Sequence, residues 1–211
     1  MKQTARIGAV VSSLVVATAA LAGTEPYFNP LTQSTSVAPV NHLNELSSPW
    51  QTPAGISQTN LMSMAEVEAD VNQTIQRIPA GNVSSMFDML AYDPKGRYIF
   101  IPHETPVGAG ISRYDTKKDE TQLLFAGDLG GANGDWSNDY AAFDPARWTP
   151  NKTVIAGEEW SGLGRVVELM KPLGKAPGSA EAALASNLVE GKDYRVLESI
   201  AKVAHEGINF S

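Results

Sequence analysis

The stretch TVIAGEEWSGLGRVVEL, residues 153–169, has the pattern of two strands joined by a tight turn. Residues 153–155 have β-branched side chains, which favour an extended backbone. Gly162 and Gly164 let the chain reverse direction without a Cβ penalty, and an alternating segment begins at Arg165. The stretch therefore predicts an antiparallel hairpin.

An acidic pair, Glu158 and Glu159, stands at the end of the first strand of this hairpin. Carboxylates that follow an apolar strand are costly unless they reach water, a cation or a metal. Since neighbouring residues of a strand point to opposite faces, one of the two must point away from the other.

The same pattern occurs earlier, in RYIFIPHETPVGAGISRYD at residues 97–115, where a strand ends in His103 and Glu104 before a glycine turn. The preceding sequence also repeats, because Asp88 opens DMLAYDP and Asp139 opens DYAAFDP. We therefore align Asp88 with Asp139. Glu206 then begins a third unit.

Repeated units of several strands, with a period of about 40 to 50 residues, are typical of propeller blades. The sequence predicts a mainly β fold: a β-propeller fragment over residues 82–211, with two blades and the start of a third. Because closing a propeller takes about four blades or more, we expect it to continue beyond the chain end.

An N-terminal extension precedes these repeats. Residues 1–22 have a basic start, an apolar stretch and an Ala-Leu-Ala end, which is typical of a secretory signal peptide. The apolar stretch is shorter than the roughly 20 residues of a membrane span. We therefore expect a periplasmic or secreted protein with no stable membrane anchor after signal removal.

Residues 23–81 form an extended lead-in, rich in Pro, Ser, Thr and Asn over its first part. Ser63 and Glu66 have the spacing of a capping box, and apolar residues follow at intervals of three and four. This pattern predicts one short helix near residues 63–78, ended by Pro79.

The composition excludes several function classes. The net charge of −7 argues against a nucleic-acid partner, because no basic stripe is present to neutralise phosphates. The absence of cysteine excludes disulfides and thiolate sites. Neither a G-x-S-x-G nucleophile elbow nor a P-loop occurs, so no catalytic side chain is assigned.

The candidate metal ligands are the acids that begin first strands or end second strands. In a propeller such positions converge on one central channel, where like charges repel unless a hard cation neutralises them. Oxygen ligands favour calcium or magnesium, and calcium is our prediction. The same residues also suit turn caps or a solvated rim. The candidates are Asp88, Glu104, Asp139, Glu158, Glu159 and Glu206.

The segment between the two repeats partly resembles a self-contained calcium loop. Asn133, Asp135, Ser137, Asp139 and Asp144 loosely follow the spacing of such a loop. The glycine required at the sixth position is Asn138, so the EF-hand pattern fails. A glycine- and asparagine-rich loop is the better interpretation.

The stretch 153–169, together with VAHEGINF at residues 203–210, resembles the PhoX-type alkaline phosphatases, which are secreted calcium-dependent β-propellers. The resemblance covers about residues 82–211. It implies that Glu158 and Glu159 are the family's acidic pair, and that Glu206 is its later glutamate. It further implies calcium in the channel and hydrolysis of phosphoric monoesters, with a small phosphate ester or other small molecule as substrate.

One position departs from that family. The phosphatases have an iron-binding cysteine directly before the acidic pair, whereas this chain has Gly157, which argues against iron. Two alternatives to a phosphatase therefore stay open. The first is a non-catalytic calcium-binding propeller. The second is a lactonase-type hydrolase, which a Glu-Gly start such as Glu206-Gly207 resembles.

Overall fold

The computed structural model describes residues 61–62, 66–67, 70 and 87–210. The predicted signal peptide and most of the lead-in lie outside these residues. Of the helix predicted near 63–78, Glu66, Val67 and Asp70 are described, and they are helical. Within the described part of the chain, no helix has the length and apolar character that a membrane span requires.

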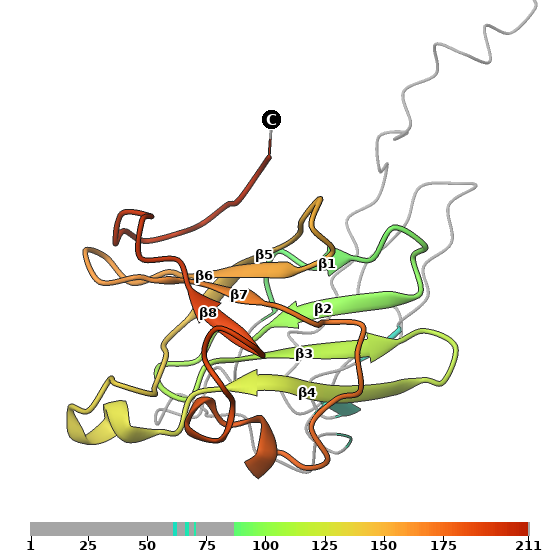
Figure 1. The fold of residues 1–211 in the computed structure, drawn as a ribbon, viewed down its shortest axis with the longest axis horizontal. Helices are drawn as coiled ribbons and strands as arrows, with labels where there is room; N and C mark the ends of the chain where they lie inside the picture. Colours follow the sequence, from blue (N-terminus) through green and yellow to red (C-terminus); the bar gives the residue numbers. More distant parts are fainter. Residues whose placement is uncertain (1–60, 63–65, 68–69, 71–86, 211) are drawn as a thin grey trace, which may run out of the picture. The chain divides into compact units, whose positions relative to one another are not determined.

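The described chain is mainly β and forms two four-stranded antiparallel sheets, each with its strands in sequence order (Figure 1). The first sheet contains β1 (Ala91–Tyr92), β2 (Tyr98–Pro102), β3 (Gly110–Asp115) and β4 (Glu120–Ala126). The second sheet contains β5 (Phe143–Trp148), β6 (Val154–Glu158), β7 (Val166–Leu169) and β8 (Tyr194–Val196). The hairpin predicted over 153–169 is confirmed, since β6 pairs with β7 in antiparallel register.

Short 3₁₀ turns occur in the connections. They span Gly130–Asn133, between the sheets, and Glu181–Ala183 and Ala185–Asn187, between β7 and β8. The buried side chain of Arg113 on β3 holds the connection between β7 and β8. Its Nη1 donates to the carbonyl oxygens of Pro172 (2.7 Å) and Gly174 (2.9 Å).

An aromatic cluster joins the two sheets. The Phe125 ring on β4 lies 5.0 Å from Tyr140, 6.0 Å from Phe143 and 4.9 Å from Tyr194, measured between centroids. Phe100 on β2 stacks on Trp148, with 5.9 Å between the ring centroids. Each aromatic side chain buries a large apolar area, so this shared core holds the two sheets together.

The ladders determine which residues of the two sheets are equivalent. Asp93 N donates to the Tyr98 carbonyl oxygen across the β1–β2 turn, and Thr149 N donates to the Thr153 carbonyl oxygen across the β5–β6 turn. Asp93 is therefore equivalent to Thr149. Asp88 and Asp144 each lie five residues before these positions, so they are equivalent to each other.

A parallel bridge between Met89 and Pro145, the residues that follow these two acids, supports this equivalence. The alignment of Asp88 with Asp139 is therefore wrong. Its physical basis was the repeated Asp-Pro pair, but Pro94 lies in the turn after β1, whereas Pro145 lies inside β5. The β5–β6 register shifts between Phe143 and Ala146, so Pro145 sits in an irregular part of that strand.

The ends of β2 and β6 also correspond. His103 N donates to the Gly110 carbonyl oxygen, and Glu158 N donates to the Arg165 carbonyl oxygen, both at 2.9 Å. His103 is therefore equivalent to Glu158, and the following residues, Glu104 and Glu159, are equivalent to each other.

Candidate metal centre

Three carboxylates from separate elements meet at one place, which we call the acidic cluster: Asp88 before β1, Glu104 after β2 and Asp144 in β5. One carboxylate oxygen of each lies within 4.8 Å of the other two. The structure thus brings together two acids predicted from the sequence, Asp88 and Glu104. The third, Asp144, was considered only for the rejected calcium loop.

Asp144 is the most constrained member of the acidic cluster. It is 4% exposed, and its Oδ1 has no hydrogen-bond partner among the described residues. Burial, followed by a side-chain hydrogen bond with Asp88 and by repulsion from Asp88, Glu159 and Glu104, raises the pKa of Asp144 to about 7. A buried carboxylate oxygen without a hydrogen-bond partner is costly, and two neighbouring carboxylates repel, so this pair requires either a proton or a cation.

A fourth acid, Glu159, influences the pKa of two members of the acidic cluster. The pKa of Glu104 is raised by burial first, and then by repulsion from Glu159 and Asp88. Glu159 also raises the pKa of Asp144. It follows β6, is exposed, and is held by a backbone bond of 2.7 Å from its N–H to the Ala142 carbonyl oxygen.

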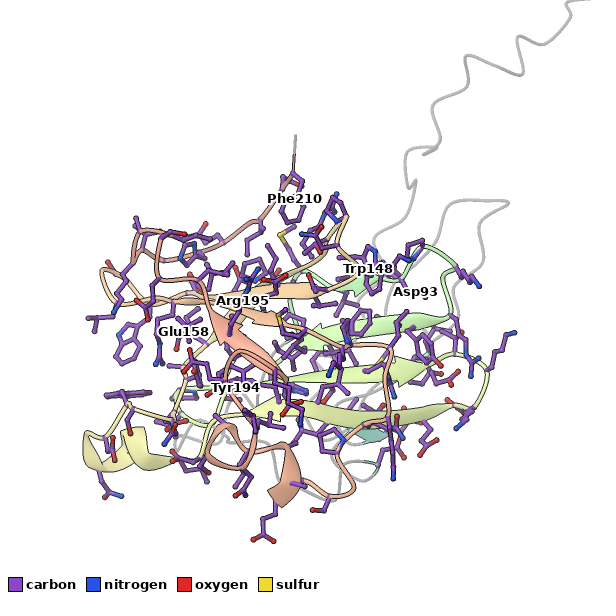
Figure 2. The ribbon with its side chains drawn as sticks, viewed as in Figure 1. Asp93, Trp148, Glu158, Tyr194, Arg195 and Phe210 are labelled. Carbon is purple, nitrogen blue, oxygen red and sulfur yellow. The ribbon has the colours of Figure 1, made fainter. Side chains whose placement is uncertain are left out.

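Glu158 lies instead in a buried ion pair inside the second sheet (Figure 2). Its Oε1 accepts from Ala141 N (2.9 Å) and from Arg165 Nη2 (3.0 Å). Its Oε2 accepts from the backbone N and the Nε of Arg165, both at 2.8 Å. The Arg165 guanidinium also lies 4.0 Å from the centre of the Tyr140 ring. This glutamate therefore joins the β6–β7 hairpin to the segment before β5.

Asp139 organises the segment that connects the sheets. Its Oδ1 accepts from the backbone N–H groups of Gly108 and Tyr140, and its Oδ2 accepts from that of Gly131, each at 2.8 Å. It is fully buried and is not a member of the acidic cluster. Glu206 is exposed, close in sequence to Ala204, which forms an isolated bridge with Glu159.

The two described histidines have different surroundings. His103 is fully buried, its Nε2 lies 2.7 Å from Ser112 Oγ, and burial lowers its pKa to about 4, so the ring is neutral. His205 packs against Gly157, where an added Cβ would lie 2.6 Å from the His205 Cβ. A cysteine side chain at position 157 would therefore have no room in this arrangement.

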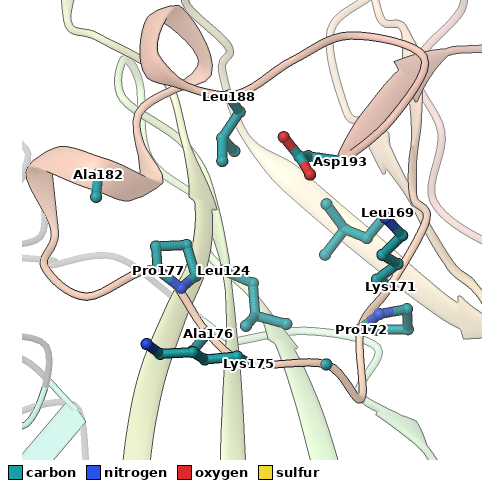
Figure 3. A pocket seen from close by; sticks show the side chains of 11 residues that line it. Leu124, Leu169, Lys171, Pro172, Lys175, Ala176, Pro177, Ala182, Leu188 and Asp193 are labelled. Atoms are coloured by element: carbon teal, nitrogen blue, oxygen red, sulfur yellow. The ribbon is translucent and has the colours of Figure 1, made fainter.

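A hollow separate from the acidic cluster lies between β4, β7 and the connection that leads to β8 (Figure 3). Leu124, Leu169 and Leu188 give it a largely apolar lining. Its one acid, Asp193, already accepts a hydrogen bond at Oδ2 from Val189 N (3.0 Å). We therefore assign the candidate chemistry to the acidic cluster, where Asp144 has an oxygen without a partner.

Comparison with known proteins gives no independent assignment of this site. No protein-family model matches the chain, and neither the curated proteins nor the solved structures contain a match.

Proposed function

We propose that this chain is a metal-dependent hydrolase of phosphoric monoesters, with calcium held at the acidic cluster. The observation that carries the proposal is the buried Asp144, whose Oδ1 has no partner among the described residues and whose carboxylate has one oxygen within 4.8 Å of Asp88 and Glu104. A calcium ion bound there would polarise a phosphoryl oxygen and favour attack by water. The carboxylates would hold that ion, and no side-chain nucleophile is required.

We also propose that the two sheets are consecutive blades of a propeller. Each is a four-stranded antiparallel meander, and their first strands meet through the parallel bridge between Met89 and Pro145. Equivalent acids at the starts of first strands and the ends of second strands support this arrangement, because these positions face the channel of a propeller. Secretion or periplasmic location belongs to the same proposal and rests on the N-terminal sequence.

A second candidate is a calcium-binding propeller without turnover. It is favoured by the charges around the site, because no lysine or arginine appears among the neighbours that shift the pKa values of Glu104 and Asp144, and each of those neighbours is a carboxyl group. A phosphatase also needs basic groups to hold the phosphate. Gly157, in place of the family's cysteine, points in the same direction, and a lactonase-type hydrolase stays an outcome of the test.

The test is turnover by the purified chain with p-nitrophenyl phosphate and, separately, with an aliphatic lactone, in calcium and in chelator. We expect phosphate release that chelator abolishes and that Asp144→Asn removes. Glu198→Gln, at an exposed position, is the matched control and should retain activity. Calcium binding without hydrolysis of either substrate would support the non-catalytic candidate, and hydrolysis of the lactone alone would support the lactonase.

A further inference from the structure

We propose that four carboxylates in two equivalent pairs hold the cation, and that Glu158 is not a ligand. Asp88 and Glu104 form the pair from the first sheet, and Asp144 and Glu159 form the pair from the second. This inference rests on the cation site of the proposed function, but not on turnover. It divides the acidic pair at the end of β6 into one ligand and one structural residue.

Glu159 is assigned by its equivalence to Glu104 and by its backbone hydrogen bond to the segment before Asp144. It occupies in the second sheet the position that Glu104 occupies in the first, since His103 and Glu158 make the same backbone hydrogen bond one residue earlier. Its backbone N–H donates to the carbonyl oxygen of Ala142 (2.7 Å), two residues before Asp144, so it lies beside the segment that carries Asp144. Because its side chain is exposed, it can turn toward the acidic cluster without breaking a buried contact.

Glu158 is excluded because its carboxylate is already fully occupied. It is completely buried, and its two oxygens accept four hydrogen bonds, three of them from Arg165. A cation would have to displace the guanidinium of Arg165, whose side chain is only 15% exposed and would then lack a counter-charge. Strand alternation agrees, because neighbours at the end of β6 face opposite sides.

The proposed ligand set suits calcium better than magnesium. Four carboxylates that bind through one or both oxygens offer roughly four to eight ligand atoms, and calcium takes about six to eight. Magnesium keeps several waters and accepts fewer carboxylates. In a group of acids on the surface, water hydrates each oxygen. Here Asp144 is only 4% exposed, and its Oδ1 receives no hydrogen bond from any described residue.

The arrangement also makes the cation a link between the sheets. Without it, four negative charges from two sheets repel one another across their shared edge, and with it the same charges attract a common centre. Calcium binding should therefore raise the thermal stability of the folded chain by mass action.

The experiment measures calcium affinity by titration calorimetry and melting temperature by scanning calorimetry, on the full chain. Glu159→Gln should bind calcium at least about tenfold more weakly, since even groups that only orient a ligand are worth that much. Its melting temperature in chelator should not fall. Glu158→Gln should melt at a lower temperature in chelator, yet keep both the wild-type calcium affinity and the calcium-induced rise in melting temperature.

The control Glu198→Gln should change neither quantity. If Glu158→Gln does not fold, Arg165→Lys weakens the same ion pair more mildly and carries the same expectation. The ligand set is overturned if Glu159→Gln binds calcium like the wild type, if a folded Glu158→Gln loses binding, or if the wild type binds no calcium. Absence of turnover despite calcium binding would overturn only the enzymatic proposal.

Discussion

The two sheets have the same strand order but differ at the buried position that ends their second strand. In the first sheet this position is His103, a neutral ring hydrogen-bonded to Ser112. In the second it is Glu158, paired with Arg165. A neutral pair and an ion pair thus satisfy the same place in the fold, so packing alone does not require an acid there.

The next residue behaves differently. It is a glutamate in both sheets, Glu104 and Glu159, and the residue at the start of the first strand is an aspartate in both, Asp88 and Asp144. These four positions keep an acidic residue although burial, and then mutual repulsion, raises the pKa of Asp144 and Glu104. Acidic residues that destabilise the fold by themselves, yet occur at equivalent positions of both sheets, are expected to bind a ligand.

The largest effect should come from Glu158→Ala. Removing one partner of a buried ion pair leaves Arg165 without a counter-charge, so the free energy of unfolding should fall by about 3–5 kcal/mol. Glu168→Ala breaks the other ion pair of the second sheet, but its partner Arg195 is about half-exposed and stays hydrated, so the loss should be smaller. Urea unfolding at neutral pH measures both. Equal losses would mean that the Glu158 pair has no special structural weight.

The next effect concerns Gly157, whose counterpart in the first sheet is Pro102. Gly157→Ala places a Cβ 2.6 Å from the His205 Cβ, and overpacking of this kind typically costs about 1–3 kcal/mol. Gly178→Ala is the matched control, because nothing lies within 4 Å of a Cβ built there. The measurement is again the free energy of unfolding. If the two variants were equally stable, the contact between His205 and the end of β6 would not contribute to the fold.

A moderate effect is expected from pH. The pKa of Asp144 is about 7 in the folded chain and about 4 when unfolded, so in chelator the folded state binds the extra proton between these values. Stability should therefore fall as pH rises from about 4 to about 7, and Asp144→Asn should remove that part of the fall. Calcium should cancel it as well. Melting curves in chelator and in calcium test this, and the same pH profile in both would count against a cation beside Asp144.

The strands could be predicted from the sequence because the patterns that indicate them are local. Residues 153–155 and the glycine turn at 162–164 predicted the β6–β7 hairpin, and Glu104, Glu158 and Glu159 were recognised together as acids that end second strands. Asp144 was not recognised as the equivalent of Asp88, because the register shift within β5 moves its Asp-Pro pair into the strand, while the Asp-Pro pair of the first repeat lies in a turn. No local pattern distinguishes these two placements.

The division of the acidic pair was only half predictable. Strand alternation states that Glu158 and Glu159 face opposite sides, but not which one faces the core. That choice depends on Arg165, which lies across the hairpin, and on Ala141, which comes from the chain segment before β5. The position of such partners is a tertiary fact that propensity and spacing do not contain.

The smallest effect concerns the turn between the first and second strands of each sheet. In the first sheet Asp115 accepts from Arg97 Nε (3.2 Å) and Nη2 (2.7 Å), and chiefly this pairing lowers the pKa of Asp115 to about 2. Near the turn of the second sheet, the contact between Thr149 Oγ1 and Thr153 Oγ1 (2.6 Å) is uncharged. Asp115→Asn should therefore lower stability slightly at neutral pH, and less than Glu168→Ala.

The pH dependence makes this comparison specific. Because the folded pKa of Asp115 lies below its unfolded value of about 4, its contribution is complete above that value and is lost as pH falls through about 2. The stability difference between Asp115→Asn and the wild type should thus shrink across this range. Denaturant unfolding from pH 5 to pH 2 measures it. A difference for Asp115→Asn that does not change with pH would show that its side chain acts through packing at the turn, and that the charge of Arg97 is immaterial.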